Sequence, residues 1–325
     1  MLTTATSALA ALQPAPRCVA GMVDDGIVRA GAVQAAFAGK LLYIGGWQYC
    51  AGGLESMDKG MKNDVWEVGP LWPPGQHPPN QYRNFRLLRK HCEFEPRSDM
   101  ACCVGADGLL YMCGGRSSPT TSESLFNDLW RSKDGVAWER ICQEAPWTAR
   151  HSHALVACPG SAGDLLLLGG QAEKVDGGWR TFNDVWRYVA ETGEWICLTP
   201  KAGWCPRIHP TVRVGKNNDL VLVGGEVVHP CQKVGGNRGE QPEELLNDLW
   251  RSTDAGRSWQ LVLQQGPFAP ARKPWFEYLP LHICYIIFSE RTGSIGQSSK
   301  VFRSLDLAEW EVLAQETLED KVQAV

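Results

Sequence analysis

Short apolar runs recur along the chain, and each of them ends in a pair of glycines. They read LLYIGG at 41–46, LLYMCGG at 109–115, DLLLLGG at 164–170 and DLVLVGG at 219–225. Short apolar runs bounded by glycine and polar residues are typical of buried β-strands and are too short for ordinary helices. The pattern therefore predicts an all-β chain built from repeated units.

A tetrad of Asn, Asp, Val or Leu, and Trp follows each glycine pair. Its copies occupy 63–66, 127–130, 183–186 and 247–250, and a degenerate fifth copy, KVFRS at 300–304, has Phe302 in the Trp position. A second Trp follows the later copies, at 138, 195, 259 and 310. Ahead of the glycine pairs, an Arg opens another β-rich run, as in RSDMACCVG at 97–105, RHSHALVA at 150–157 and RIHPTVRV at 207–214.

Each unit is therefore expected to hold four strands, a to d, with the Arg opening strand a, the glycine pair closing strand b and the tetrad on strand c. A period of roughly 50 residues with four strands per unit favours an antiparallel β-propeller, because one such blade cannot cover its own apolar face. The glycine pair suits a backbone with positive φ or close approach. The Trp side chains are expected to fill the space between neighbouring blades.

The glycine pair, the aromatic position on strand c and the Trp on strand d resemble the kelch family over roughly residues 29–313. STDAGRSW at 252–259 is also similar to the Asp-box hairpin of sialidase-like propellers, and SKDGVAW and SLDLAEW are degraded versions of it. This resemblance implies that Asp254 caps backbone N–H groups in a turn. It also implies that Trp259 packs into the blade.

Five units are legible, so we expect five blades over residues 29–313, with an N-terminal tail or leader at 1–28 and a C-terminal tail at 314–325. The fifth unit departs from the pattern, because ICYIIFSERTG at 283–293 has no glycine pair. Kelch propellers usually have six or seven blades. A six-bladed ring, with residues 1–28 supplying further strands, is the alternative.

Composition and charge narrow the class of protein. The 325 residues are 44% hydrophobic with a net charge of −4, and no block of Lys and Arg indicates nucleic-acid binding. No apolar stretch is long enough to span a membrane. The 12 Cys include no C-x-x-C pair and no Asn begins a glycosylation sequon, which favours a cytoplasmic location. The Ser-, Thr- and Ala-rich leader leaves an organelle or secretion open.

The Arg residues at the start of strand a are the first candidates for binding: Arg29, Arg97, Arg150, Arg207 and Arg272. In a propeller they would lie on the face that carries the b–c and d–a loops, near the mouth of the central channel. A ring of guanidinium groups suits a carboxylate, a phosphate or an acidic peptide. The kelch resemblance implies the alternative that these side chains pair with acidic or backbone groups of the blades.

Long loops on the same face supply further candidates. The b–c connections at 47–62 and 226–245 are the longest, and the Pro-rich segment 68–85 is an insertion after strand c of the first unit. Binding normally resides in such loops on a rigid scaffold. The remaining predicted contact residues are therefore His153 near strand a and, on the b–c loops, Trp47, Tyr49, His229 and Arg238.

Signs of catalysis are few. His151 and His153 alternate and would share one face of a strand, but the kelch pattern already places a His at position 153, so neither a metal nor a cofactor is predicted. The chain has no nucleophile motif and no phosphate-binding glycine loop. Paired carboxylates of a glycosidase, whose separation is set in space, would escape this search.

The sequence thus predicts a kelch-type propeller without catalytic activity, a scaffold that binds a protein partner with an acidic peptide or surface. A small anion or a sugar is a further candidate ligand. The rival is a carbohydrate-active enzyme of the sialidase or sialate-mutarotase kind, supported by the Asp-box and the Arg set. A sugar-binding propeller is a third reading.

Overall fold

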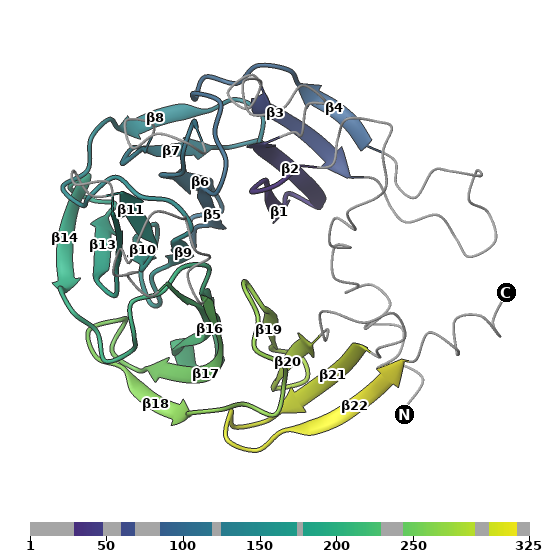
Figure 1. The fold of residues 1–325 in the computed structure, drawn as a ribbon. Coiled ribbons are helices and arrows are strands. Elements are labelled where there is room, and N and C mark those ends of the chain that lie inside the picture. Colours follow the sequence, from purple (N-terminus) through teal and green to yellow (C-terminus); the bar gives the residue numbers. More distant parts are fainter. Residues whose placement is uncertain are drawn as a thin grey trace, which may run out of the picture.

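In the computed structural model, five four-stranded antiparallel sheets are arranged around a common axis and form a five-bladed β-propeller (Figure 1). The structure describes residues 29–47, 60–68, 85–118, 125–173, 178–228, 243–289 and 299–316. The predicted leader at 1–28, most of both long b–c loops and the Pro-rich insertion lie outside these ranges. Among the residues described, no helix is long and apolar enough to cross a membrane.

Each blade is made of strands that follow one another in the sequence, so the predicted order a to d is confirmed. Blade 1 contains β1 (Val33–Phe37), β2 (Lys40–Trp47), β3 (Met61–Val68) and β4 (Phe85–Arg89). Blade 2 contains β5 (Ala101–Val104), β6 (Leu110–Cys113), β7 (Leu129–Ser132) and β8 (Glu139–Cys142).

Blade 3 contains β9 (Ala154–Ala157), β10 (Leu165–Leu168), β13 (Val185–Val189) and β14 (Glu194–Thr199). Its b–c loop forms a hairpin of its own, with β11 (Gln171–Glu173) paired to β12 (Trp179–Thr181). Blade 4 contains β15 (Thr211–Val214), β16 (Leu220–Val228), β17 (Glu243–Ser252) and β18 (Gln260–Leu263). Blade 5 contains β19 (Trp275–Leu279), β20 (Cys284–Ser289), β21 (Ser299–Ser304) and β22 (Glu311–Glu316), which continues past residue 313.

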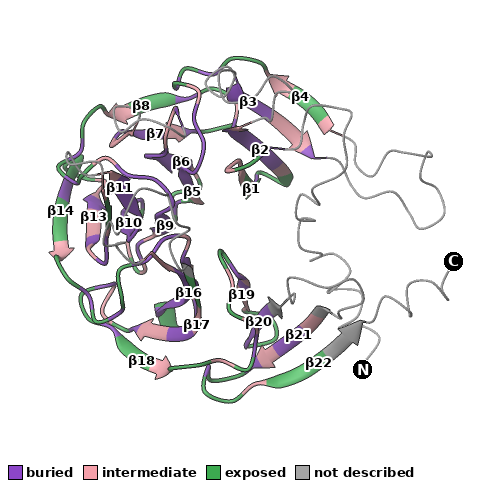
Figure 2. Cartoon of the chain, viewed as in Figure 1, coloured by how far each residue is buried: buried purple, intermediate pink, exposed green. Residues whose placement is uncertain are grey.

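This strand order gives the ring two distinct faces. The b–c and d–a connections lie on one, here called the loop face, and the a–b and c–d turns lie on the other, the hairpin face. The innermost strands of successive blades contact one another from β1 through β5, β9 and β15 to β19. Figure 2 shows buried residues gathered on middle strands such as β2, β6 and β10, and exposed residues along outermost ones such as β8, β14, β18 and β22.

The glycine pairs have the backbone that the sequence predicts. All eight glycines have positive φ, from 57° at Gly45 to 104° at Gly225. A Cβ at Gly114 would lie 2.8 Å from the carbonyl oxygen of Arg150 in the next blade and 2.5 Å from the ring of His153. The end of strand b therefore approaches its neighbour closely enough that only glycine fits.

The two apolar residues of each tetrad pack on opposite sides of the blade. Leu129 belongs to the cluster between blades 2 and 3, whereas Trp130 belongs to the cluster between blades 1 and 2. Trp138, which immediately precedes the outer strand β8, joins Trp130 against blade 1. The prediction that the Trp residues fill the space between blades is thus confirmed.

A third aromatic recurs three residues before the strand-a Arg or its equivalent in blades 2 to 5. The sequence contains this repeat, but it was not among the predictions. Its members are Phe94, Trp147, Trp204 and Phe268, and each of these side chains is 1–3% exposed. Each ring meets the Trp of strand d edge-on, with centroid distances from 5.6 Å for Phe94 and Trp138 to 6.3 Å for Trp204 and Trp259. These aromatics pack the d–a loop against the Trp of the blade that follows it in the chain.

Three c–d turns share a Ser-x-Asp motif. In the turn of blade 4, the Asp254 carboxylate accepts hydrogen bonds from the backbone N–H of Ser258 at 2.9 Å and from the hydroxyls of Ser252 and Ser258 at 2.8 and 2.6 Å. Asp134 and Asp306 accept backbone N–H groups of their turns in the same way. Asp254 therefore has the turn-capping contacts that the resemblance implied.

Replacing Trp204 tests the role of the d–a aromatics. We expect Trp204→Ala to lower the free energy of unfolding by on the order of 3–5 kcal/mol, because it empties a fully buried site. Trp204→Phe should cost much less, since Phe94 and Phe268 occupy the same place at other blade junctions. Urea unfolding followed by circular dichroism measures both. Equal losses for the two variants would contradict this role.

Candidate functional site

The predicted Arg ring lies at the loop face, where it was expected, but its guanidinium groups are buried. Arg97, Arg150 and Arg207 are 0–1% exposed. Arg150 donates to the two carboxylate oxygens of Asp184 at 2.6 and 2.9 Å and to the carbonyl of Gly169 at 2.9 Å. Arg97 with Asp128 and Arg207 with Asp248 repeat the arrangement at 2.6–2.8 Å.

Aromatic rings cover these guanidinium groups. The Arg150 guanidinium lies 3.8 Å from the ring centroid of Phe182 and 5.9 Å from that of Trp147, and Arg97 has the same relation to Phe126 and Phe94. The Arg backbone meanwhile bonds to the preceding blade: the N–H of Arg150 donates to the carbonyl of Phe126, and its carbonyl accepts from Gly115. Each Arg therefore ties its own sheet to the one before it.

The rest of the tetrad completes this junction. Asp184 also accepts the indole N–H of Trp186 at 2.8 Å. Asn183 donates to the carbonyls of Ala202 and Trp204 at 2.9 and 3.0 Å, which fixes the d–a loop. The Asn amide nitrogen, the Asp carboxylate and the Trp indole nitrogen of the tetrad thus have partners inside the protein. Direct contact between a partner molecule and Arg97, Arg150 or Arg207 stays a prediction, and such contact would require displacing an Asp carboxylate.

The end blades differ from each other. Arg29 is 6% exposed and pairs with Asp64, as in blades 2 to 4. In blade 5 the equivalent position is Ala271, whose carbonyl accepts from Gly225 as the Arg carbonyls do elsewhere. Lys300 stands in the Asp position of that blade. Arg272, which the sequence pattern assigned to the ring, is displaced by one residue, has an exposed side chain and pairs with Glu226.

The two His residues near strand a of blade 3 lie in different surroundings. Ser152 between them has a φ of 57° and β9 begins only at Ala154, so the expected alternation along a strand does not apply. His153 is 3% exposed and its Nε2 lies 3.3 Å from the sulfur of Cys113. Its ring is packed between blades 2 and 3, whereas His151 lies toward the channel.

The predicted loop residues are only partly covered by the structure. Trp47 ends β2 and pairs through its backbone with Ala30. Tyr49, His229 and Arg238 lie outside the described residues. Among those that are described, no group of three or more His, Cys, Asp or Glu side chains is arranged to hold a metal ion.

A ring of residues that the sequence pattern did not single out surrounds the axis on the loop face. It comprises the residue two positions after each strand-a Arg or its equivalent, and we call it the axial ring: Gly31, Asp99, Ser152, His209 and Lys273. All five have positive φ, between 45° and 64°. The backbone N–H of each later member donates to the carbonyl of the one before it, at 2.8–2.9 Å. Aligning the units on their Arg positions would have identified these residues from the sequence.

Asp99 is the acidic member of the axial ring. Its carboxylate pairs with Arg116, whose Nε donates to Oδ2 at 2.9 Å, and it lies against Gly31, where a Cβ would be 2.7 Å from Oδ1. Burial alone would raise the pKa of Asp99, but the charges of Arg116 and Lys273 outweigh it and lower the pKa to about 2. Asp99 is therefore ionised at neutral pH.

Two neutral imidazoles lie beside this carboxylate. Burial, reinforced by Arg116, lowers the pKa of His151 to about 4. Burial and the ammonium group of Lys273 lower the pKa of His209 to about 3. Both rings are uncharged at neutral pH, in a channel that also holds the Asp99–Arg116 pair.

Exposed side chains surround the axial ring on the loop face. Trp179 on β12 is 39% exposed and its ring meets that of His151 edge-on at 5.8 Å. Arg180 beside it is exposed, with its guanidinium 5.0 Å from the Phe182 ring. Together with Arg272 and Lys273, these residues form the surface that we call the channel mouth. An exposed Trp beside Arg and Lys side chains is a composition suited to binding protein partners.

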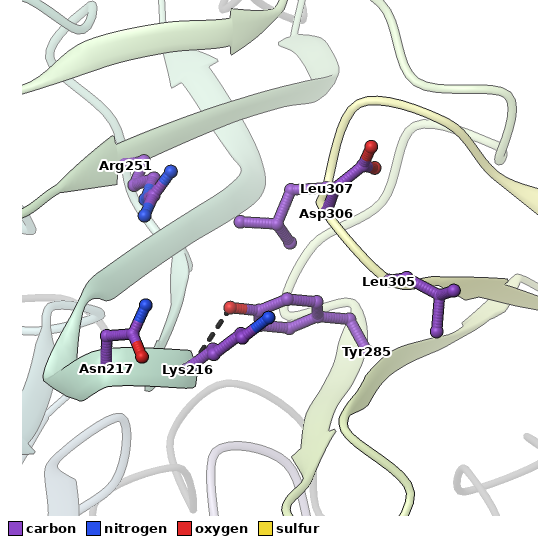
Figure 3. A pocket seen from close by; sticks show the side chains of 7 residues that line it. All are labelled: Lys216, Asn217, Arg251, Tyr285, Leu305, Asp306 and Leu307. Carbon is purple, nitrogen blue, oxygen red and sulfur yellow. Dashed lines mark hydrogen bonds between the residues drawn. The ribbon is translucent and has the colours of Figure 1, made fainter.

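The hairpin face has a small cavity of its own, of about 160 Å³, between blades 4 and 5 (Figure 3). Arg251, Tyr285 and Asp306 line it together with Lys216 and Leu307. Its polar groups are engaged within the fold: Arg251 pairs with Asp219, and the Tyr285 hydroxyl accepts the N–H of Lys216 at 3.0 Å. This cavity presents fewer available groups than the channel mouth.

The sequence matches no protein-family model and no curated protein. The geometry of the channel mouth is therefore the basis for any statement about function.

Breaking one buried ion pair tests its structural role. We expect Arg150→Met to lower the free energy of unfolding by on the order of 3–5 kcal/mol, because the Asp184 carboxylate is left buried without its cation. The double variant Arg150→Met/Asp184→Asn should recover part of that loss, since blade 5 forms without either partner of the pair. Urea unfolding measures both. If the double variant is as unstable as the single one, the loss does not come from leaving Asp184 without its cation.

The neutral imidazoles predict a pH dependence of stability. Below about pH 6.5 the unfolded chain binds protons at His151 and His209, whereas the folded chain does so only near pH 4 and 3. Stability should therefore fall as the pH falls through this window. His209→Asn, which tolerates the positive φ, should reduce the slope by up to one proton, about 1.4 kcal/mol per pH unit. Unfolding measured between pH 4.5 and 7 checks this, and an unchanged slope would contradict it.

Proposed function

We propose that this chain is a non-catalytic interaction module of the kelch type, which binds an acidic segment of a protein partner at the channel mouth. The observation that carries the proposal is the concentration of Trp179, Arg180, Arg272 and Lys273 around the axis on the loop face. The long b–c loops predicted to take part begin on the same face. The turns capped by Asp134, Asp254 and Asp306 support the relation to Asp-box propellers.

The rigidity of the ring supports this role. The buried Arg–Asp pairs and the interblade aromatics hold five sheets in register, so the loop face presents its side chains on a fixed frame. Binding to a preorganised surface loses less conformational entropy than binding to a mobile one. The surplus of basic groups at the mouth favours an acidic partner through electrostatic complementarity.

The carbohydrate-enzyme alternative has less support. Its main argument was a ring of Arg side chains free to hold an acidic sugar, and four of the five are instead paired with Asp carboxylates in the blades. Burial raises the pKa of the Cys102 thiol to about 12 and that of Cys113 well above its usual value, which makes both poor nucleophiles at neutral pH. The interaction module is the function that these contacts favour.

A reducing compartment belongs to the same proposal. The nine cysteines in the described ranges are all free, and several of them are packed as small apolar side chains in the interblade clusters. We therefore propose that the module acts in the cytoplasm.

Selection of random displayed peptides on the purified chain tests the proposal. We expect acidic peptides to be enriched, and Trp179→Ala to weaken their binding by about tenfold or more, because an exposed Trp at the centre of an interface often carries over 1.4 kcal/mol. Affinities are measured by fluorescence polarisation with labelled peptides.

Leu281→Ala is the matched control, since Leu281 is a 95% exposed apolar residue on the hairpin face. Its affinity for the selected peptides should equal that of the unaltered chain. Enrichment of peptides without acidic residues, or a loss caused by Leu281→Ala but not by Trp179→Ala, would refute binding at the channel mouth.

A further inference from the structure

Buried nitrogen atoms without a partner lie on the axial ring and on His151, which precedes its member Ser152. Among the described residues, Nε2 of His151 and Nδ1 of His209 have no hydrogen-bond partner although both atoms are buried. Nδ1 of His151 lies 2.9 Å from the Ser152 hydroxyl. When that hydroxyl donates to Nδ1, the imidazole proton resides on Nε2, which then needs an acceptor. Buried polar atoms are nearly always paired, so this orphaned donor marks a place for a ligand.

The charges around these nitrogens leave one cation in excess. Arg116 is neutralised by Asp99, and Arg272 is neutralised by Glu226. Within the described ranges, Lys273 has no carboxylate at ion-pair distance. Its charge nevertheless acts on Asp99 in blade 2, His151 in blade 3 and His209 in blade 4. The Lys273 backbone N–H donates to the His209 carbonyl at 2.9 Å, so its side chain starts beside these groups.

The chemistry of this set favours a single negative charge. One surplus cation matches a monoanion, whereas a phosphate dianion would be left with excess charge close to the Asp99 carboxylate. A carboxylate has two oxygens, so it can accept from an imidazole N–H and an ammonium group at the same time. Neutral imidazoles serve here as hydrogen-bond donors without adding further charge.

We propose that the axial ring, together with the neighbouring His151, is a binding site for one carboxylate group of the partner, held by the Lys273 ammonium and the Nε2–H of His151, with His209 beside them. This inference rests on the proposed function and identifies the group that anchors the partner. An acidic side chain, or the carboxyl terminus, of the bound segment enters the channel while the rest of the segment lies on the channel mouth.

Nuclear magnetic resonance of the chain with ¹⁵N-labelled histidine tests the site directly. The probes are N-acetyl-glutamate N-methylamide for a side-chain carboxylate, N-acetyl-glycine for a terminal one, and inorganic phosphate. We expect at least one carboxylate probe to shift the His151 and His209 ring signals saturably, and phosphate to bind more weakly. The preferred carboxylate probe tells which source the site takes. The pKa of both rings should rise on binding, since a nearby anion favours the imidazolium form.

Lys273→Asn removes the cation and keeps a residue that tolerates a φ of 45°. It should weaken binding of the carboxylate probe by about tenfold, the worth of one charge-assisted hydrogen bond. Lys133→Asn, which alters an exposed lysine in a c–d turn, is the control and should bind as the unaltered chain does. Absence of saturable shifts with both carboxylates, equal affinity in Lys273→Asn, or tighter binding of phosphate would each overturn the proposal.

The peptide measurement separates this inference from the proposed function. If selected peptides lose affinity in Trp179→Ala but not in Lys273→Asn, the channel mouth binds its partner and the axial carboxylate site is wrong. If the carboxylate probes bind and no peptide does, the axial site stands and the partner proposed for the mouth is wrong.

Discussion

The buried pair of Arg and Asp is the interaction on which this propeller depends. Its Arg lies just ahead of strand a and its Asp at the start of strand c of the same sheet, while the Arg backbone bonds to the sheet before it. A charge of either sign left alone at this depth would be costly, so the two residues stabilise the fold only together. Blade 5 illustrates the point, because it has Ala271 and Lys300 in place of both partners and still forms a four-stranded sheet.

This junction decides where the molecule can interact with others. The recurring Asn, Asp, Trp and Arg side chains bind to one another and to the backbone at the blade junctions. What remains available on the loop face is the non-recurring material: the residue at each axial position and the side chains of the b–c connections. The five axial positions share one backbone conformation but are occupied by five different residue types. A common scaffold thus presents a polar cluster that no single blade contains.

Much of the fold follows from periodic features that are local in sequence. Apolar runs closed by Gly-Gly form strands at the predicted places because a short apolar stretch between turn residues has few other ways to be buried. The aromatic residues at 94, 147, 204 and 268 recur as regularly and could have been found by the same alignment. Arg272 was assigned to the ring because it opens an apparent strand, whereas the backbone bonds show Ala271 in that position. A shift of one residue reverses which side chain faces the core.

The sequence by itself determined the four-stranded unit, its repetition and the packing of the tryptophans, because these depend on spacing within one blade or between adjacent ones. Only the tertiary structure decided that the Arg side chains are enclosed by carboxylates and that Asp99, His151, His209 and Lys273 share one channel. Those four residues come from four blades, and the steps between them along the chain are 52, 58 and 64 residues. The arrangement of the blades around one axis, with their inner strands in contact, brings them together, and burial then sets their charges.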